Sequence, residues 1–152
     1  MKNKTFLVTG GTGFIGSKIS KSLVEAGHKV IIFDNNSRGN LRRVISIKKK
    51  IKIIKGDIRD FQKLKKSMKN VDAVIHLAYV NGTKFFYSQP TKILEIAVKG
   101  ILNVLEICIQ KKISELYLAS SSEVYQTPNK IPTKENEALK IPNIFNPRYS
   151  YG

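Results

Sequence analysis

The stretch Thr9-Gly-Gly-Thr-Gly-Phe-Ile-Gly16 decides the fold, because it joins a short apolar run to the start of a helical pattern. Its glycines fit both Gly-x-Gly-x-x-Gly and Gly-x-x-Gly-x-x-Gly. Such a turn lets the chain leave a strand sharply, lets backbone without a Cβ approach a pyrophosphate, and packs the helix closely on the strand. The free amides at the helix N-terminus then face the phosphates. The stretch therefore predicts a dinucleotide-binding unit, with a plain strand-to-helix turn as the alternative.

Around this turn, short apolar runs typical of strands alternate with longer segments typical of helices. Because the runs are continuously apolar, we expect parallel strands that are covered on both faces, in an α/β fold. The expected strands are residues 5–9, 29–33, 51–54, 73–77 and 116–119, and the expected helices are residues 14–26, 61–69 and 90–110.

An acidic residue ends the second expected strand. Asp34 follows Gly16 by eighteen residues, near the spacing at which a carboxylate binds the adenosine ribose hydroxyls. That carboxylate would repel a 2′-phosphate, which favours NAD over NADP, although Arg38 nearby could accommodate the phosphate. Asp34 could instead form a turn before Asn35. Asp57, after the third strand, is a candidate for the adenine edge or for a helix N-cap.

Composition excludes several classes of protein. The 152 residues carry 27 Lys+Arg against 11 Asp+Glu, a formal net charge of +16 that raises nucleic acid as a partner. The arginines and aromatics that read nucleic acids do not cluster with the lysines, so we expect no specific nucleic-acid binding. The single cysteine, Cys108, has no metal-ligand spacing around it, and predicts neither a disulfide framework nor a metal site but a reducing cytoplasm. We expect no membrane partner and no signal peptide, because no apolar run is long enough for a span and none at the N-terminus resembles a leader.

Two further segments call for an explanation. Apolar residues surround nearly the whole axis of the helix from Pro90 to Gln110, which a one-sided surface helix would not need. Its outer face is expected to lie either beneath another helix of the same chain or in a helix–helix homodimer interface. The proline-rich segment from Gln126 to Pro147 is expected to be an irregular, functional surface loop.

Six motifs in order resemble the extended short-chain dehydrogenases/reductases, and within them the NAD-dependent epimerase/dehydratase family. They are the glycine-rich turn, Asp34-Asn35, Gly56-Asp-Ile58, His76-Leu-Ala78, Ala119-Ser-Ser-Ser-Glu-Val-Tyr125 and Tyr151. The resemblance implies a Rossmann-type, doubly wound parallel sheet of strand order 3-2-1-4-5. It also implies that residues 1–152 form an NAD-binding domain that stops before the later strands and the substrate domain.

The resemblance also assigns roles to individual residues. It implies NAD as cofactor and a nucleotide sugar as substrate, with Ser121 and Tyr151 as catalytic residues. Tyr151 would belong to a Tyr-x-x-x-Lys motif whose lysine falls beyond Gly152, and His76 would serve packing rather than proton transfer. The implied cofactor-binding residues are Gly10, Gly13, Phe14, Ile15, Gly16, Asp34, Asn35, Asp57, Ile58, Leu77 and Ala78.

Three residues depart from the family pattern. Ala97 and Ile101 stand where many members have Asn and Thr, and Gln126 stands where Gly usually follows Val-Tyr. Two hypotheses therefore remain open. The first is the NAD-binding portion of a nucleotide-sugar epimerase or dehydratase, inactive without its lysine. The second is a non-catalytic dinucleotide-binding sensor or regulatory module.

Overall fold

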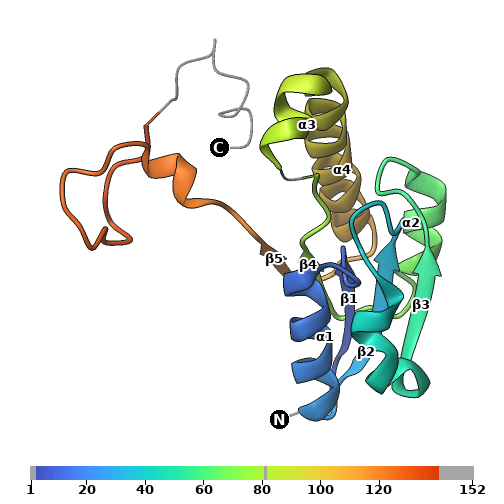
Figure 1. The fold of residues 1–152 in the computed structure, drawn as a ribbon. Coiled ribbons are helices and arrows are strands. Elements are labelled where there is room, and N and C mark those ends of the chain that lie inside the picture. Colours follow the sequence, from blue (N-terminus) through green and yellow to red (C-terminus); the bar gives the residue numbers. More distant parts are fainter. Residues whose placement is uncertain (1–2, 81, 141–152) are drawn as a thin grey trace.

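A single parallel sheet forms the centre of the molecule. The computed structural model describes residues 3–80 and 82–140, and its five strands lie in the order β3-β2-β1-β4-β5 (Figure 1). All four neighbouring pairs are parallel, so the expected α/β class and strand order are confirmed. The strands are β1 Thr5–Thr9, β2 Lys29–Asp34, β3 Ile51–Lys55, β4 Ala73–His76 and β5 Glu115–Leu118.

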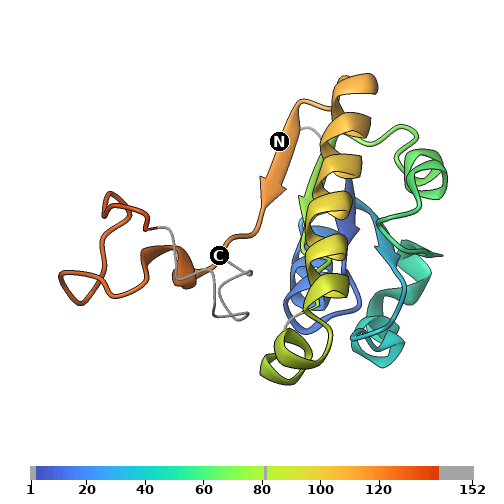
Figure 2. The ribbon, with the colours of Figure 1, turned by 90° about the horizontal axis from the view of Figure 1, so that it is seen from above.

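Helices cover both faces of this sheet. On one face lie α1 (Phe14–Glu25) and the 3-10 helix η1 (Leu41–Lys50), and on the other lie α2 (Phe61–Ser67) and α4 (Pro90–Gln110) (Figures 1 and 2). Neighbouring residues of one strand serve opposite faces, since Leu7 packs in the α2/α4 core and Val8 in the α1/η1 core, both fully buried. This two-sided burial explains why the strands are continuously apolar.

Three short helices had not been expected from the sequence. They are η1, α3 (Thr83–Ser88) and η2 (Ser122–Tyr125). In η1 the only described buried residues are Val44 and Ile47, three positions apart, which meet the sheet once per turn of a 3-10 helix. Polar and basic residues make up most of the rest of η1, and its last turn is Lys48–Lys50. Its sequence therefore resembles that of a basic loop.

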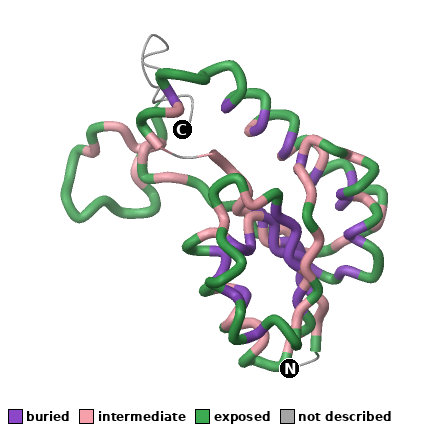
Figure 3. Tube along the Cα trace, turned by 45° about the vertical axis from the view of Figure 1, so that its right-hand side comes forward, coloured by how far each residue is buried: buried purple, intermediate pink, exposed green. Residues whose placement is uncertain are grey.

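The chain after β5 has little regular structure. It leads away from the sheet in Figures 1 and 2, and Figure 3 shows it largely exposed. Residues 126–140 contain neither helix nor strand, in agreement with the expected irregular loop, and the rest of that loop lies outside the described residues. Within the described part of the chain β5 is an edge strand, and Tyr117 and Leu118 on it are exposed.

Candidate cofactor and catalytic site

The glycine-rich turn makes a cradle at the carboxyl end of β1. Gly10 adopts φ +68°, a region that favours glycine, and its amide donates to the Phe33 carbonyl oxygen at 2.9 Å. A Cβ on Gly10 would lie 2.9 Å from the backbone nitrogen of Ala78, and one on Gly16 would lie 2.2 Å from the Gly10 carbonyl oxygen. Side chains are therefore excluded at Gly10 and Gly16, which leaves bare backbone at these two positions of the turn.

Asp34 fastens this turn to the loop after β2. Its Oδ2 accepts hydrogen bonds from the Thr12 amide (2.9 Å) and hydroxyl (2.6 Å), and its Oδ1 accepts from the Asn36 amide at 2.8 Å. Gly39 must lack a side chain because a Cβ there would lie 1.8 Å from Thr12 Oγ1. The turn-forming role considered for Asp34 is thus present. It leaves the carboxylate, only 8% exposed, at the rim of the cradle.

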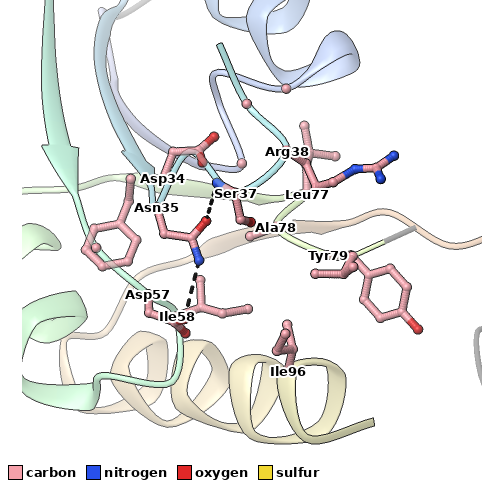
Figure 4. Close-up of a pocket in the computed structure, with 16 residues that line it drawn as sticks. Asp34, Asn35, Ser37, Arg38, Asp57, Ile58, Leu77, Ala78, Tyr79 and Ile96 are labelled. Atoms are coloured by element: carbon pink, nitrogen blue, oxygen red, sulfur yellow. Dashed lines mark hydrogen bonds between the residues drawn. The ribbon is translucent and has the colours of Figure 1, made fainter. Parts of the chain in front are cut away.

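The loop after β3 brings a second carboxylate to the same cavity. Asp57 Oδ2 accepts from Asn35 Nδ2 at 3.3 Å, so the ends of β2 and β3 are linked (Figure 4). Hydrogen bonds and charge from Arg59 lower the pKa of Asp57 to about 2. Asp57 is not the N-cap of the following helix. Asp60 caps α2, accepting from the Lys63 amide at 3.0 Å.

Ile58 forms the apolar side of this cavity and is held by α4. Asn103 Nδ2 donates to the Ile58 carbonyl oxygen at 2.8 Å. Gly100 allows the close approach, because a Cβ there would lie 2.2 Å from Ile58 Cδ1. The cavity has a volume of about 90 Å³, and Figure 4 shows Asp34, Asn35, Asp57, Ile58, Leu77, Ala78 and Ile96 around it.

A larger cavity of about 650 Å³ adjoins the first, and the residues that line both are Gly10, Gly13, Arg38, Leu77, Ala78 and Tyr79. Ser121 lines this second cavity, and its Oγ accepts from the Glu123 amide at 3.2 Å. Ala97 and Ile101 of α4 line it as well. The predicted residues Phe14, Ile15 and Gly16 complete its wall on the side of the glycine-rich turn.

His76 also lines the second cavity but is only 7% exposed, and its Nδ1 is 2.8 Å from Thr9 Oγ1. Burial lowers the pKa of His76 to about 4, so the imidazole is neutral at pH 7. This agrees with the packing role expected from the sequence. Gln126, at the departure from the family pattern, adopts φ +54°, a conformation that favours the usual glycine.

All eleven predicted cofactor residues and Ser121 line one or both of these cavities. Tyr151 lies outside the described residues. Several other contributors could not be predicted from the sequence, because their roles depend on how loops and helices pack. They are Thr12, Arg43, Tyr79 and Asn103. Arg43 stands out among them, since its Nη1 donates to the Thr12 carbonyl oxygen at 3.3 Å and its side chain lines the larger cavity.

Two features are absent from the described residues. No group of three or more His, Cys, Asp or Glu side chains is arranged for a metal ion in residues 3–80 and 82–140. No helix in the same part of the chain combines the length and apolar character that crossing a membrane requires.

Several known proteins are similar to this chain in sequence or in structure. The chain is 34% identical over 142 residues to UDP-glucose 4-epimerase of Neisseria meningitidis serogroup A, covering 90% of this chain and 42% of the relative. It is 37% identical over 148 residues to a putative UDP-glucose 4-epimerase of Methanocaldococcus jannaschii, covering 96% and 46%. The crystal structure of UDP-glucose 4-epimerase from Bifidobacterium longum in complex with NAD+ and UDP superposes with a TM-score of 0.86 at 29% identity, covering 97% of this chain and 45% of that one.

The chain thus spans less than half the length of these relatives. The family model that matches residues 6–152 describes an NAD dependent epimerase/dehydratase family, in agreement with the cofactor and the enzymatic character expected from the motifs. With nearly the whole sequence matched, the chain belongs to the NAD dependent epimerase/dehydratase family.

Proposed function

We propose that this chain is the NAD-binding portion of a nucleotide-sugar epimerase or dehydratase. The observation that carries the proposal is the pair of adjoining cavities at the carboxyl ends of the parallel strands, where ligands bind in open α/β sheets. NAD fits the residues present, because Gly10 and Gly16 keep side chains out of the part of the turn where a pyrophosphate would lie. Asp34 offers a carboxylate at the rim, as a ribose diol requires.

Each part of the cofactor has its own proposed contacts. Gly10, Gly13 and Gly16, with the backbone of Phe14 and Ile15, would hold the pyrophosphate at the start of α1. Asp34 and Asn35 would bind the adenosine ribose, Asp57 and Ile58 would bind adenine, and Leu77 and Ala78 would line the nicotinamide side. When bound there, NAD supplies a reversible hydride acceptor.

Residues of this chain would remove the proton of the sugar hydroxyl and bind its oxygen. Tyr151 would take that proton, and Ser121 would donate a hydrogen bond to the same oxygen. A tyrosine that works as a base near neutral pH needs its pKa lowered from about 10 toward 7, a change worth about 4 kcal/mol. A nearby ammonium would supply part of it, which is the role proposed for a lysine four positions after Tyr151.

NAD and NADP titrations of the chain test the cofactor site. We expect saturable NAD binding and weaker NADP binding, because the Asp34 carboxylate repels a 2′-phosphate. Asp34→Asn, which removes the charge but keeps the shape, should weaken NAD binding by about tenfold, the value of a hydrogen bond to a charged group. The same substitution should also reduce the difference in affinity between NAD and NADP. Asp60→Asn is the matched control, since Asp60 caps α2 and lines neither cavity. Absence of NAD binding would contradict the proposal.

A non-catalytic dinucleotide-binding module remains the second candidate. Ala97 and Ile101 favour it, because they line the larger cavity with methyl groups where the family pattern has polar side chains. The test compares this chain with one extended through the expected lysine. The enzyme hypothesis expects turnover of a nucleotide sugar to rise by orders of magnitude in the extended chain and to be lost again in its Ser121→Ala variant. Equal, negligible turnover by both chains would favour the module.

The proposed partners are a nucleotide-sugar substrate and a second copy of the chain. The homodimer proposal rests on α4, whose Leu94, Val98, Leu102, Leu105 and Ile109 are exposed. A cytoplasmic location stays a prediction from cysteine usage.

A further inference from the structure

An arginine holds the segment that would meet the adenine base, and this inference rests on the proposed NAD site. Arg59 and Asp57 are joined by two side-chain hydrogen bonds, Nε to Oδ1 at 3.0 Å and Nη2 to Oδ2 at 2.9 Å. The Arg59 amide adds a third to Oδ1 at 2.9 Å. A bidentate pair of this kind fixes the plane of a carboxylate as well as its position.

The same guanidinium reaches α4. Arg59 Nη1 donates to Glu95 Oε2 at 2.9 Å, so Asp57, Arg59 and Glu95 form one chain of charge-assisted contacts. The Asp57 and Arg59 side chains are 29% and 27% exposed, and Glu95, at 49%, lies at the rim. Together with the Asn103 bond to the Ile58 carbonyl oxygen, these contacts hold residues 57–59 to one helix.

Only one hydrogen-bond acceptor position of the Asp57 carboxylate is weakly held. An ionised carboxylate has about four acceptor positions. Arg59 fills three of them, and Asn35 Nδ2 takes the fourth at 3.3 Å, the longest contact of the set. Figure 4 shows this contact at one side of the small cavity, which Asn35 and Asp57 both line. A hydrogen-bond donor on a ligand in that cavity can replace Asn35 at Oδ2.

We propose that Arg59 is a positioning residue for base recognition: it holds the Asp57 carboxylate so that the cavity accepts a purine with an exocyclic amino group and rejects a 6-oxo purine. An amino group donates to Oδ2 in place of Asn35, whereas a 6-oxo group presents a second acceptor to a carboxylate and is repelled. The lowered pKa of Asp57, about 2, agrees with a carboxylate that cannot become a donor near neutral pH.

The test is calorimetric titration of the chain with NAD and with nicotinamide hypoxanthine dinucleotide, which differ only at the 6-position of the purine. We expect NAD to bind at least about tenfold more tightly. Arg59→Lys keeps the positive charge but loses the two-pronged geometry, and should bring the ratio of the two dissociation constants to within about threefold. Arg42→Lys is the matched control because Arg42 is exposed and lines neither cavity.

The ratio of the two dissociation constants separates a positioning role of Arg59 from general support of the fold. A merely structural role would weaken the binding of both ligands equally. A ratio that stays unchanged in folded Arg59→Lys, or a ratio near one in the parent chain, overturns the inference. If Arg59→Lys does not fold, Asp57→Asn decides. Its amide can donate to the 6-oxo group, so the preference should vanish or reverse, and an unchanged preference overturns the inference. NAD binding in these cases leaves the proposed function standing, whereas absence of NAD binding contradicts both.

Discussion

At the scale of single residues, Thr9 and His76 show how side chains order the end of the sheet. Thr9 Oγ1 accepts from the amides of Leu77 and Ala78, both at 3.1 Å, so its own proton is directed to His76 Nδ1. The imidazole is therefore neutral, with its proton on Nε2. This network holds the two residues proposed to line the nicotinamide side of the cofactor.

Acid should weaken the fold through His76. Its pKa is about 4 in the folded chain and 6.5 in the reference state, so the unfolded chain binds more protons between those values. Stability should be unaffected by this group above pH 6.5 and should fall as the pH drops toward 4, by up to about 3 kcal/mol. Urea unfolding between pH 4 and 7 measures the slope. His76→Gln should flatten it, and an equal slope in that variant would contradict the assignment.

The site was predictable from sequence to different degrees at different residues. Gly10, Gly16 and Asp34 follow from local rules, because a glycine-rich turn and an acid at a strand end are encoded by adjacent positions. Arg59 and Asn103 could not be assigned in this way. Their contacts depend on the rotation of α4 about its axis and on its distance from the loop after β3, which are set by packing of the whole core.

At the scale of elements, α4 approaches the loop after β3 closely at Gly100. Gly100 lies against Ile58, which is 5% exposed. In most helices a change from glycine to alanine stabilises, because glycine loses more backbone entropy on folding. At this position the added methyl group would occupy the space of Ile58 Cδ1, and Ile58 is too deeply buried to turn away freely.

Gly100→Ala should therefore destabilise the chain, by about 1–3 kcal/mol as is usual for overpacking. Ile58→Val removes the Cδ1 atom, so the double variant should recover part of that loss, while Cγ1 stays 2.9 Å from the added Cβ. Thermal unfolding of the parent, both single variants and the double variant completes the cycle. Additive effects of the two substitutions would show that the two residues do not meet as described.

The elements themselves were largely predictable. All five strands, α1, α2 and α4 were expected within two residues of their observed ends, because each has either a continuous apolar run or a helical apolar period. The short helices η1 and α3 were not expected. In η1 only Val44 and Ile47 are buried, and six-residue α3 buries only Phe86 among its described residues, so neither presents a periodic pattern.

At the scale of the whole molecule, α4 and the edge strand β5 present apolar side chains to solvent. The exposed apolar residues of α4 are spaced by three or four positions and so form one stripe, while Tyr117 and Leu118 are exposed on β5. The buried residues of α4, among them Ile93, Val104 and Ile107, lie on its other side against the sheet. An apolar stripe of this length is typical of a helix that packs against another helix.

The isolated chain should therefore associate through this stripe, defined by Leu94, Val98, Leu102, Leu105 and Ile109. Light scattering during size-exclusion chromatography should give a mass that rises with concentration above the 17.1 kDa of one chain. Replacing Leu102 and Ile109 by Gln should shift the chain toward monomer, because it removes two of the most exposed apolar side chains of the stripe. Lys99→Gln, on the same helix but outside the stripe, should leave association unchanged. A parent chain that stays monomeric over the whole range, with one sharp melting transition, would mean that the stripe does not drive self-association.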